Sequence, residues 1–190
     1  KRNKTLHPRS GGLAKLRFNG NVNRTGFDFT HGTLTAGIKK YFPVMTKSSF
    51  SLLARAGGKI HGDMPEVMAY SLGGPYTVRG YRMSTIGTGE GFMMASAELT
   101  TPFFFLDRIE TAKFLDNIKF SVFIDAGQLF NGSITNQLYK RPEYGIAGGV
   151  GIKLFIPGVG PLSIDYGIPF TNVGEGNRRG AFSFGVGDIF

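Results

Sequence analysis

The chain has no cysteine and no tryptophan among its 190 residues. The lack of cysteine excludes disulfides, zinc–cysteine sites and a thiol nucleophile. No apolar run approaches the roughly 20 residues that a membrane-spanning helix needs, and no segment has the pattern of a long helix. Without tryptophan, an aromatic belt at a membrane surface would have to consist of phenylalanine and tyrosine. The chain starts at Lys1 without a methionine or an apolar signal segment, so we expect a processed protein or a piece of a longer one.

Sequence patterns of enzymes and metal sites are weak or missing. His7, His31 and His61 are scattered, with no acidic or histidine partner at ligand spacing, so we predict no metal site. The glycines at residues 87–91 resemble a dinucleotide-binding loop, but they lead into a strand pattern with no helix to offer its N-terminus to a phosphate. No Gly-x-Ser-x-Gly elbow occurs. We therefore predict neither an enzyme nor a cofactor.

Glycine and phenylalanine are abundant instead, with 29 and 18 residues, a composition typical of an all-β protein. Eight segments alternate apolar residues with polar or small ones, as strands with two different faces do. These segments are residues 13–22, 33–42, 49–57, 91–102, 118–127, 146–156, 162–168 and 181–190.

The polar face of these segments carries many charges, which decide between two all-β folds. A secreted β-sandwich would alternate in the same way, but so many charges do not suit a sandwich core, whereas they suit a water-filled lumen. We therefore predict an antiparallel transmembrane β-barrel of about eight strands. The charged residues are Lys15, Arg17, Lys39, Arg55, Glu98, Lys119, Asp125, Lys153 and Asp165.

The connections alternate short and long, as in a meander with one end in a confined space and the other in open solvent. With Phe190 on the periplasmic side, residues 58–90, 131–143 and 171–180 lie outside. Residues 103–117 are a long exception on the inside, where one short helical turn fits residues 107–114. Residues 58–90 show no sustained period, so we expect a long loop without regular structure, and such loops usually have a function or are disordered.

This loop contains the densest turn chemistry of the chain, at residues 73–81. Gly80 permits a turn that a residue with a Cβ would resist, so Arg79 is held at a kink. The phase of the strand at residues 118–127 places Asp125 on the polar face, where its carboxylate and a loop arginine would satisfy one another. The alternative is that Arg79 is a solvated loop cation.

The formal net charge is +9, which fits a nucleic-acid partner, an anionic lipid surface or a solvated surface. No basic segment is interleaved with stacking aromatic residues, so we expect no nucleic acid and favour a solvated or lipid-phosphate role for the basic clusters.

Six motifs in order between residues 73 and 190 resemble the C-terminal half of the BamA-like outer-membrane barrel-assembly family, the bacterial surface antigen superfamily, with its translocation and organelle relatives. Residues 1–57 match it only in strand pattern. The motifs are Gly73-Gly74 with Val78-Arg79-Gly80-Tyr81, Ala95-Ser96-Ala97-Glu98 with Pro102, Phe123-x-Asp125-x-Gly127, Gly148-Gly149-Val150-Gly151, Gly160-Pro161-Leu162 with Asp165-Tyr166-Gly167, and Phe182-Ser183-Phe184-Gly185 to Phe190.

The resemblance implies a 16-stranded barrel whose last eight strands correspond to residues 1–190, one transmembrane domain. It also implies that the loop at residues 58–90 folds into the lumen and that Arg79 meets Asp125 there, with Glu98 as a neighbouring acceptor. A closed eight-stranded barrel is too narrow for such a loop, so we expect a fragment or one part of a larger assembly. We call the residues that would hold the loop in the lumen the lock residues. They are Val78, Arg79, Gly80, Tyr81, Glu98, Phe123, Asp125 and Gly127.

The function implied is to fold and insert β-barrel proteins into a bacterial outer membrane, or the outer envelope of an endosymbiotic organelle, through a weak barrel seam. The alternatives are a polypeptide-translocating pore, of the two-partner secretion or TamA-like type, and a surface antigen without an assembly role. Implied partners are outer-membrane lipid and lipopolysaccharide, unfolded outer-membrane proteins, assembly-complex lipoproteins, and the missing half of the barrel or another copy of the chain. The seam and C-terminal signal comprise Gly180, Phe182, Phe184, Gly185, Gly187 and Phe190.

Overall fold

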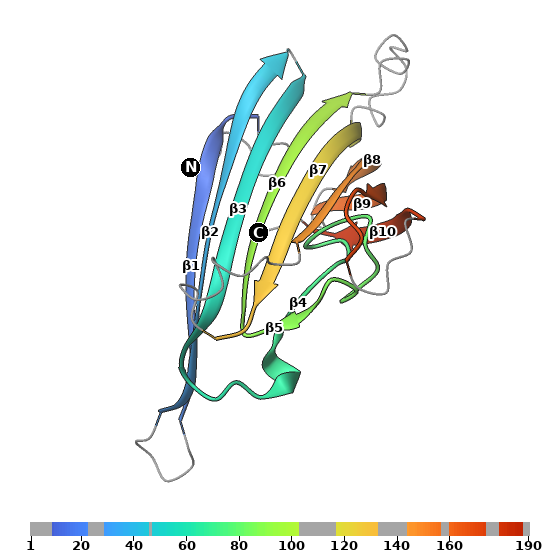
Figure 1. Cartoon of the computed structure of the whole chain (residues 1–190). Coiled ribbons are helices and arrows are strands. Elements are labelled where there is room, and N and C mark those ends of the chain that lie inside the picture. The colour runs from blue at the N-terminus through green and yellow to red at the C-terminus, as the bar shows by residue number, and fades with distance from the viewer. Residues whose placement is uncertain are drawn as a thin grey trace.

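The structure, a computed structural model, describes residues 9–22, 29–45, 47–102, 117–132, 144–156, 160–173 and 179–187. Eight long strands form one antiparallel sheet in which each strand pairs with its neighbours in chain order (Figure 1). These strands are β1 (Gly11–Val22), β2 (Phe29–Met45), β3 (Ser48–Gly62), β6 (Gly91–Pro102), β7 (Ile118–Phe130), β8 (Tyr144–Ile156), β9 (Gly160–Pro169) and β10 (Ala181–Val186).

The sheet is curved and open, because β1 and β10 each pair with one strand only within the described residues. The prediction of an all-β antiparallel barrel of about eight strands is therefore confirmed, in the form of a partial barrel. No helix in the described part of the chain is long and apolar enough to cross a membrane.

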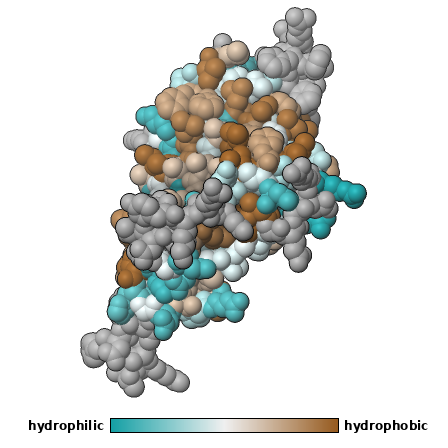
Figure 2. Space-filling model, in the orientation of Figure 1, coloured by the Kyte–Doolittle hydropathy of each residue, from teal (hydrophilic) through white to brown (hydrophobic). Residues whose placement is uncertain are grey.

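The two faces of the sheet differ as the alternation predicts. Large apolar side chains stand exposed on the outer face, where Leu16 is 73% exposed and Phe182 is 78% exposed. Figure 2 shows hydrophobic side chains gathered over the middle of the face in view and hydrophilic ones towards its lower end. The inner face buries polar and charged side chains instead, namely Thr33, Lys39, Ser51, Glu98, Lys119, Ser121, Asp125, Asp165 and Ser183.

Several strands are longer than the sequence pattern indicates. The strand predicted at residues 33–42 extends further at both ends, since β2 begins at Phe29 and continues to Met45. Pro43 is tolerated inside β2 because the pairing with β1 ends at Tyr41, so among the described residues no strand on that side needs the missing N–H.

The expectation of a structureless connection at residues 58–90 is also wrong. β3 continues to Gly62 because its last residues still pair with β2. Beyond it come a single 3-10 turn, η1 (Glu66–Met68), and the strands β4 (Tyr70–Leu72) and β5 (Gly87–Gly89), which pair with each other as a second, two-stranded sheet. Short pieces of this kind carry too few residues to show a period.

At the other end of the chain, the strand expected over residues 181–190 stops at Val186, because Gly187 turns the backbone with a φ of 92°. Phe190 and the helical turn predicted at residues 107–114 lie outside the described residues.

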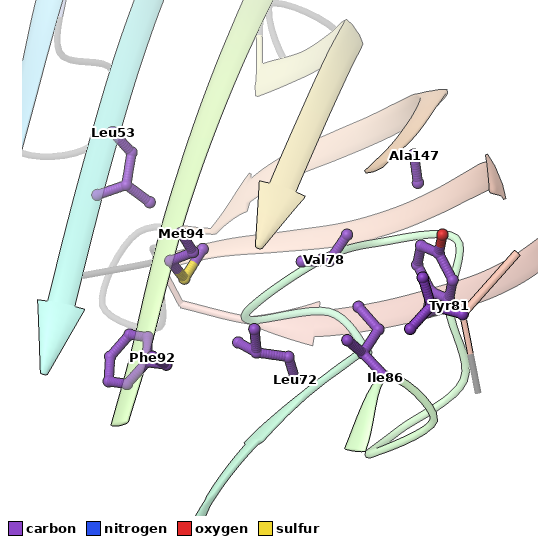
Figure 3. Packing of buried hydrophobic residues seen from close by; sticks show 9 residues of the cluster. Leu53, Leu72, Val78, Tyr81, Ile86, Phe92, Met94 and Ala147 are labelled. Atoms are coloured by element: carbon purple, nitrogen blue, oxygen red, sulfur yellow. The ribbon is translucent and has the colours of Figure 1, made fainter. Parts of the chain in front are cut away.

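The core lies between the folded-in loop and the inner face of the sheet. Figure 3 shows loop residues facing residues of the strands, with Val78 and Tyr81 near Ala147 of β8. Packing of these apolar side chains fixes the loop against the inner face of the eight-stranded sheet, which we call the wall. The cluster consists of Leu53, Leu72, Val78, Tyr81, Ile86, Phe92, Met94, Ala147 and Val173.

Candidate functional site: a loop arginine held against the inner wall

Arg79 reaches the wall because the loop closes on itself just before and after it. The amide of Gly74 donates to the carbonyl of Tyr81 at 3.0 Å, so the intervening residues form a tight projection. Gly80 has a φ of 94°, which residues with a Cβ rarely adopt, and this turns the chain directly after the arginine.

The guanidinium of Arg79 is 1% exposed and binds Asp125 of β7 through two parallel hydrogen bonds. Nε donates to Oδ2 at 2.8 Å, Nη2 donates to Oδ1 at 3.0 Å, and the backbone amide of Arg79 also donates to Oδ2 at 3.0 Å. A bidentate pair of this kind fixes orientation as well as position. The ring of Phe123 lies 3.6 Å from the guanidinium carbon and covers one face of the cation.

Glu98 of β6 is the second acceptor, at 2.7 Å from Nη1 of Arg79. Its other oxygen accepts from the ammonium of Lys153 on β8 and, at 3.2 Å, from the hydroxyl of Thr100. Glu98 therefore joins the loop cation to a wall cation. This connection depends on the register in which Glu98 lies opposite Phe123.

Asp165 of β9 completes the cluster from the other side. Its Oδ1 lies 3.6 Å from Nη1 of Arg79, within ion-pair distance but too far for a hydrogen bond. The cluster thus brings two cations, Arg79 and Lys153, against three carboxylates. All five groups lie on the inner side of the curved sheet, and the loop supplies the central one.

The other residues of the loop motif fit the wall by shape. A Cβ on Gly127 would lie 2.7 Å from Val78, and a Cβ on Gly167 would lie 2.7 Å from the Cα of Gly80, so both wall glycines leave room for the loop. The hydroxyl of Tyr81 bonds the backbone carbonyl of Thr171 at 2.7 Å, just past the end of β9. The residues of the Val-Arg-Gly-Tyr stretch therefore each contact different residues on β7 to β9 or just past the end of β9.

The family model of the Omp85 superfamily domain matches residues 1–190. The chain belongs to the Omp85 superfamily. Its membership assigns this Omp85 chain to an outer membrane, either that of a bacterial cell or the outer envelope of an organelle, in a family of insertion and translocation proteins.

Three plant proteins are among its similar relatives. Outer envelope protein 39, chloroplastic, of Arabidopsis thaliana is 32% identical over 129 residues, 65% of this chain and 32% of the relative. Outer envelope protein 80, chloroplastic, of the same plant is 28% identical over 136 residues, 72% of this chain and 17% of the relative. Protein TOC75, chloroplastic, of Oryza sativa subsp. japonica is 28% identical over 93 residues, 49% of this chain and 10% of the relative. The chain thus spans about a third or less of these proteins.

Among solved structures, the chain is similar to BamA from Haemophilus ducreyi lacking POTRA domains 1–3. The TM-score is 0.74 at 20% sequence identity, over 97% of this chain and 39% of that one. This likeness shows the barrel fold.

The predicted seam residues of the Omp85 chain lie together on or beside β10, the strand that pairs with β9 and places Ser183 opposite Asp165 of the cluster. Phe182 and Phe184 point outward, Gly185 is buried on the inner face, and Gly180 and Gly187 flank the strand. Phe190, the remaining residue of that set, is outside the described part of the chain.

Sequence reasoning missed one residue of the loop, Tyr76, which reaches the last strand. Its hydroxyl donates to the carbonyl of Val186 at 3.0 Å and accepts from the amide of Val186 at 2.8 Å. The neighbouring Gly187 amide bonds to Pro161 of β9 at 2.7 Å, so the backbone groups of Val186 point away from β9 towards the free edge. No sequence signal marks Tyr76, because the contact spans 110 positions.

Glu90 was missed as well, although it joins three elements at the loop end of the sheet. Its carboxylate pairs with Lys59 of β3 and accepts from the amide of Gly132 at 3.0 Å, and its amide donates to Asn131 at 3.0 Å. The hydrogen bond from Lys59, followed by that from the Gly132 amide, lowers the pKa of Glu90 from its ordinary value. The charged pair therefore ties β3 to the end of β7.

The arrangement offers binding and positioning chemistry. In the described residues no group of three or more histidine, cysteine, aspartate or glutamate side chains could hold a metal ion. The carboxylate of Asp125 accepts from Arg79, and that of Glu98 accepts from Arg79 and Lys153, so both carboxylates are engaged by cations.

Proposed function

We propose that this Omp85 chain forms part of an outer-membrane protein assembly factor, which folds and inserts β-barrel proteins through a weak seam. The observation that carries the proposal is the weak last strand of the sheet: β10 has six residues next to the ten-residue β9 and pairs with β9 alone in the described part of the chain. An unpaired strand edge is a template on which an incoming strand can form backbone hydrogen bonds.

The arginine cluster supports this proposal because it gives the chain one rigid part and one weak part. Arg79, Glu98, Asp125 and Lys153 hold the loop against the middle of the sheet through buried charged hydrogen bonds. The edge at β10 is held to the loop only through the hydroxyl of Tyr76 in the described residues. A wall that must open at one edge needs support elsewhere, and the lock residues fill that role in our proposal.

The proposed clients are unfolded outer-membrane proteins, and the proposed surroundings are outer-membrane lipid and lipopolysaccharide. Assembly-complex lipoproteins are further proposed partners, as is either the missing half of the barrel or a second copy of the chain. The apolar outer face supports the lipid contact, since Leu16, Ile38 and Phe182 are each more than half exposed on it.

The test is reconstitution of the full-length protein into lipid vesicles with a urea-unfolded barrel client. We expect the client to become protease-resistant and to resist unfolding by detergent in unheated gels, faster than in empty vesicles. Vesicles carrying the Arg79→Ala variant should lose most of this acceleration, while the variant itself remains inserted. Equal client folding in empty vesicles and in vesicles with the protein would refute the assembly function.

A translocating pore of the same superfamily is a second candidate, favoured by a hollow of about 650 Å³ between the loop and β1 to β3. A pore would move a polypeptide into the vesicle interior, whereas an assembly factor leaves its client in the bilayer. Protease added outside and carbonate extraction of the vesicles separate these outcomes, because only an inserted client resists extraction.

A further inference from the structure

The hollow beside β1 to β3 is lined by cations that the arginine cluster does not use. It lies between the inner face of these strands and loop residues 68–77, with a volume of about 650 Å³, in the range of small-ligand sites. Its lining includes Lys15, Arg17, Arg55 and His31, and none of its described lining residues is an aspartate or a glutamate.

Strand register places these cations around a glycine. Lys15 of β1 lies opposite Gly37 of β2, and Gly37 lies opposite Arg55 of β3, so the three form one row across the sheet. With strands about 4.8 Å apart, the two cationic residues stand roughly 10 Å from each other across a position without a side chain. Arg17 lies two residues along β1 in the next inward-facing row, opposite Thr35. The result is a recess with a cationic rim.

These cations lack the partners that the other luminal charges have. No hydrogen bond or ion pair to a carboxylate is present for Lys15, Arg17 or Arg55 in the described part of the chain. Arg55 instead lies 5.8 Å from the centre of the Phe92 ring. The like charges repel one another, and an anion over Gly37 would relieve that repulsion.

The shape of the hollow favours an extended chain over a compact ion. Its β1 side runs from Lys15 to Asn21, about 20 Å at the rise of a strand, and its lining offers side-chain amides and hydroxyls next to the cations. These are Asn19, Thr33, Thr35, Tyr70, Ser71 and Thr77. Amides and hydroxyls can bond to a peptide backbone while the cations hold acidic side chains.

We propose that this recess binds an extended acidic polypeptide segment of about six residues, with its carboxylates on Lys15, Arg17 and Arg55. The inference rests on the proposed function in that a polypeptide must enter the lumen. It adds a chemical preference, since acidic stretches bind here and basic ones are repelled.

The test is direct binding of fluorescent hexapeptides to the purified full-length protein in detergent micelles, followed by fluorescence anisotropy. A peptide of alternating aspartate and serine should bind, and peptides with lysine or glutamine in place of aspartate should not. The double variant K15Q/R17Q should weaken binding about tenfold or more, as the loss of charged hydrogen bonds predicts. Arg82→Gln, a change of the same charge at an exposed loop arginine outside the recess, should leave binding unchanged.

Charge reversal separates a specific site from a damaged protein. The variant K15E/R17E should lose the acidic peptide and gain the lysine peptide, which an unfolded protein would not do. Equal binding of all three peptides, or competition by inorganic phosphate at the same concentration as the peptide, would overturn the proposal. Because no client and no insertion step is involved, failure here leaves the assembly assay in vesicles unaffected, and failure there leaves this binding result standing.

Discussion

At the scale of single residues, the site depends on one arginine whose hydrogen bonds are all made inside the protein. Arg79 bonds two carboxylates directly, and its Nη2 also donates to the hydroxyl of Ser96 at 3.4 Å. Burying a cation so completely is costly unless each partner stays in place, so the cluster is sensitive to the loss of any member.

The Arg79→Ala substitution should destabilise the loop by about 3 kcal/mol or more, because Asp125 and Glu98 would be left buried without their main cation. Arg79→Lys should recover little, since an ammonium cannot form the bidentate pair. Limited proteolysis within residues 63–86, as a function of urea, measures the change. The control is Arg82→Ala at an exposed position three residues on, and an equal effect of both alanine variants would contradict the cluster's role.

Gly167→Ala tests whether the loop touches the wall as described. A Cβ there would lie 2.7 Å from both the Cα and the amide nitrogen of Gly80, so the loop must move, at a cost of about 1–3 kcal/mol. Gly58→Ala on β3 is the matched control, since its nearest atoms are 3.8 Å away. Proteolysis of the loop should increase in the first variant only, and an unchanged Gly167→Ala protein would refute the contact.

The clamp at Glu90 predicts a pH dependence at the loop end of the sheet. Its folded-state pKa lies below the ordinary value of 4.5, so its contribution is present above that value and disappears as the pH falls through the folded-state pKa. Amide exchange at Gly132 should be slower in the wild type than in Glu90→Gln at pH 7, with the difference vanishing well below pH 4.5. A difference that persists unchanged in acid would exclude the charged clamp.

Part of the arginine cluster could be predicted from the sequence, because strand phase and the loop motif are local properties of the chain. Strand phase places Asp125 on the inner face, and the loop motif points Arg79 towards it. Asp165 and Lys153 carry the same phase signal, but nothing in the sequence says which luminal charges meet, because that depends on the register between four strands. The contacts of Glu90 could not be predicted for the same reason, because its partners come from separate elements.

At the scale of elements, the loop acts on two places at once, the wall through Arg79 and the edge of β10 through Tyr76. Tyr76→Phe keeps the ring and removes the hydroxyl that bridges the amide and carbonyl of Val186. At about 1 kcal/mol for a hydrogen bond, amide exchange at Val186 should rise about fivefold. Tyr144→Phe, a change at an exposed tyrosine, is the control. Equal exchange rates at the Val186 amide in both variants would show that Tyr76 does not hold the edge of β10.

Strand existence and face were predictable because the alternation is strong in every long strand. Strand ends were not, because pairing decides them. β2 runs past Pro43 since β3 still pairs with it there, and β10 stops at Val186 because Gly187 takes a left-handed conformation. The two-stranded sheet of β4 and β5 escaped detection because six residues separated by a long turn have no period.

At the scale of the whole molecule, the eight strands form a curved sheet whose outermost strands, β1 and β10, each pair with one strand in the described part of the chain. The middle strands, β6 to β9, carry the buried charges that hold the loop, while β1 borders the cationic recess and β10 ends the sheet. Under the proposed assembly function, this division would let the sheet open at β10 while the supported middle stays intact.

The most direct test of this account is cross-linking between β10 and a client during assembly. The chain has no cysteine, so a single introduced cysteine reports one position. Phe184→Cys on β10 and Val122→Cys in the middle of the sheet both face outward, at positions whose native side chains are 60% and 45% exposed. The account predicts disulfides between Phe184→Cys and cysteines in the terminal strand of a client halted during insertion, and none from Val122→Cys. Equal cross-linking from both positions, or none from β10 while the client is inserted, would contradict it.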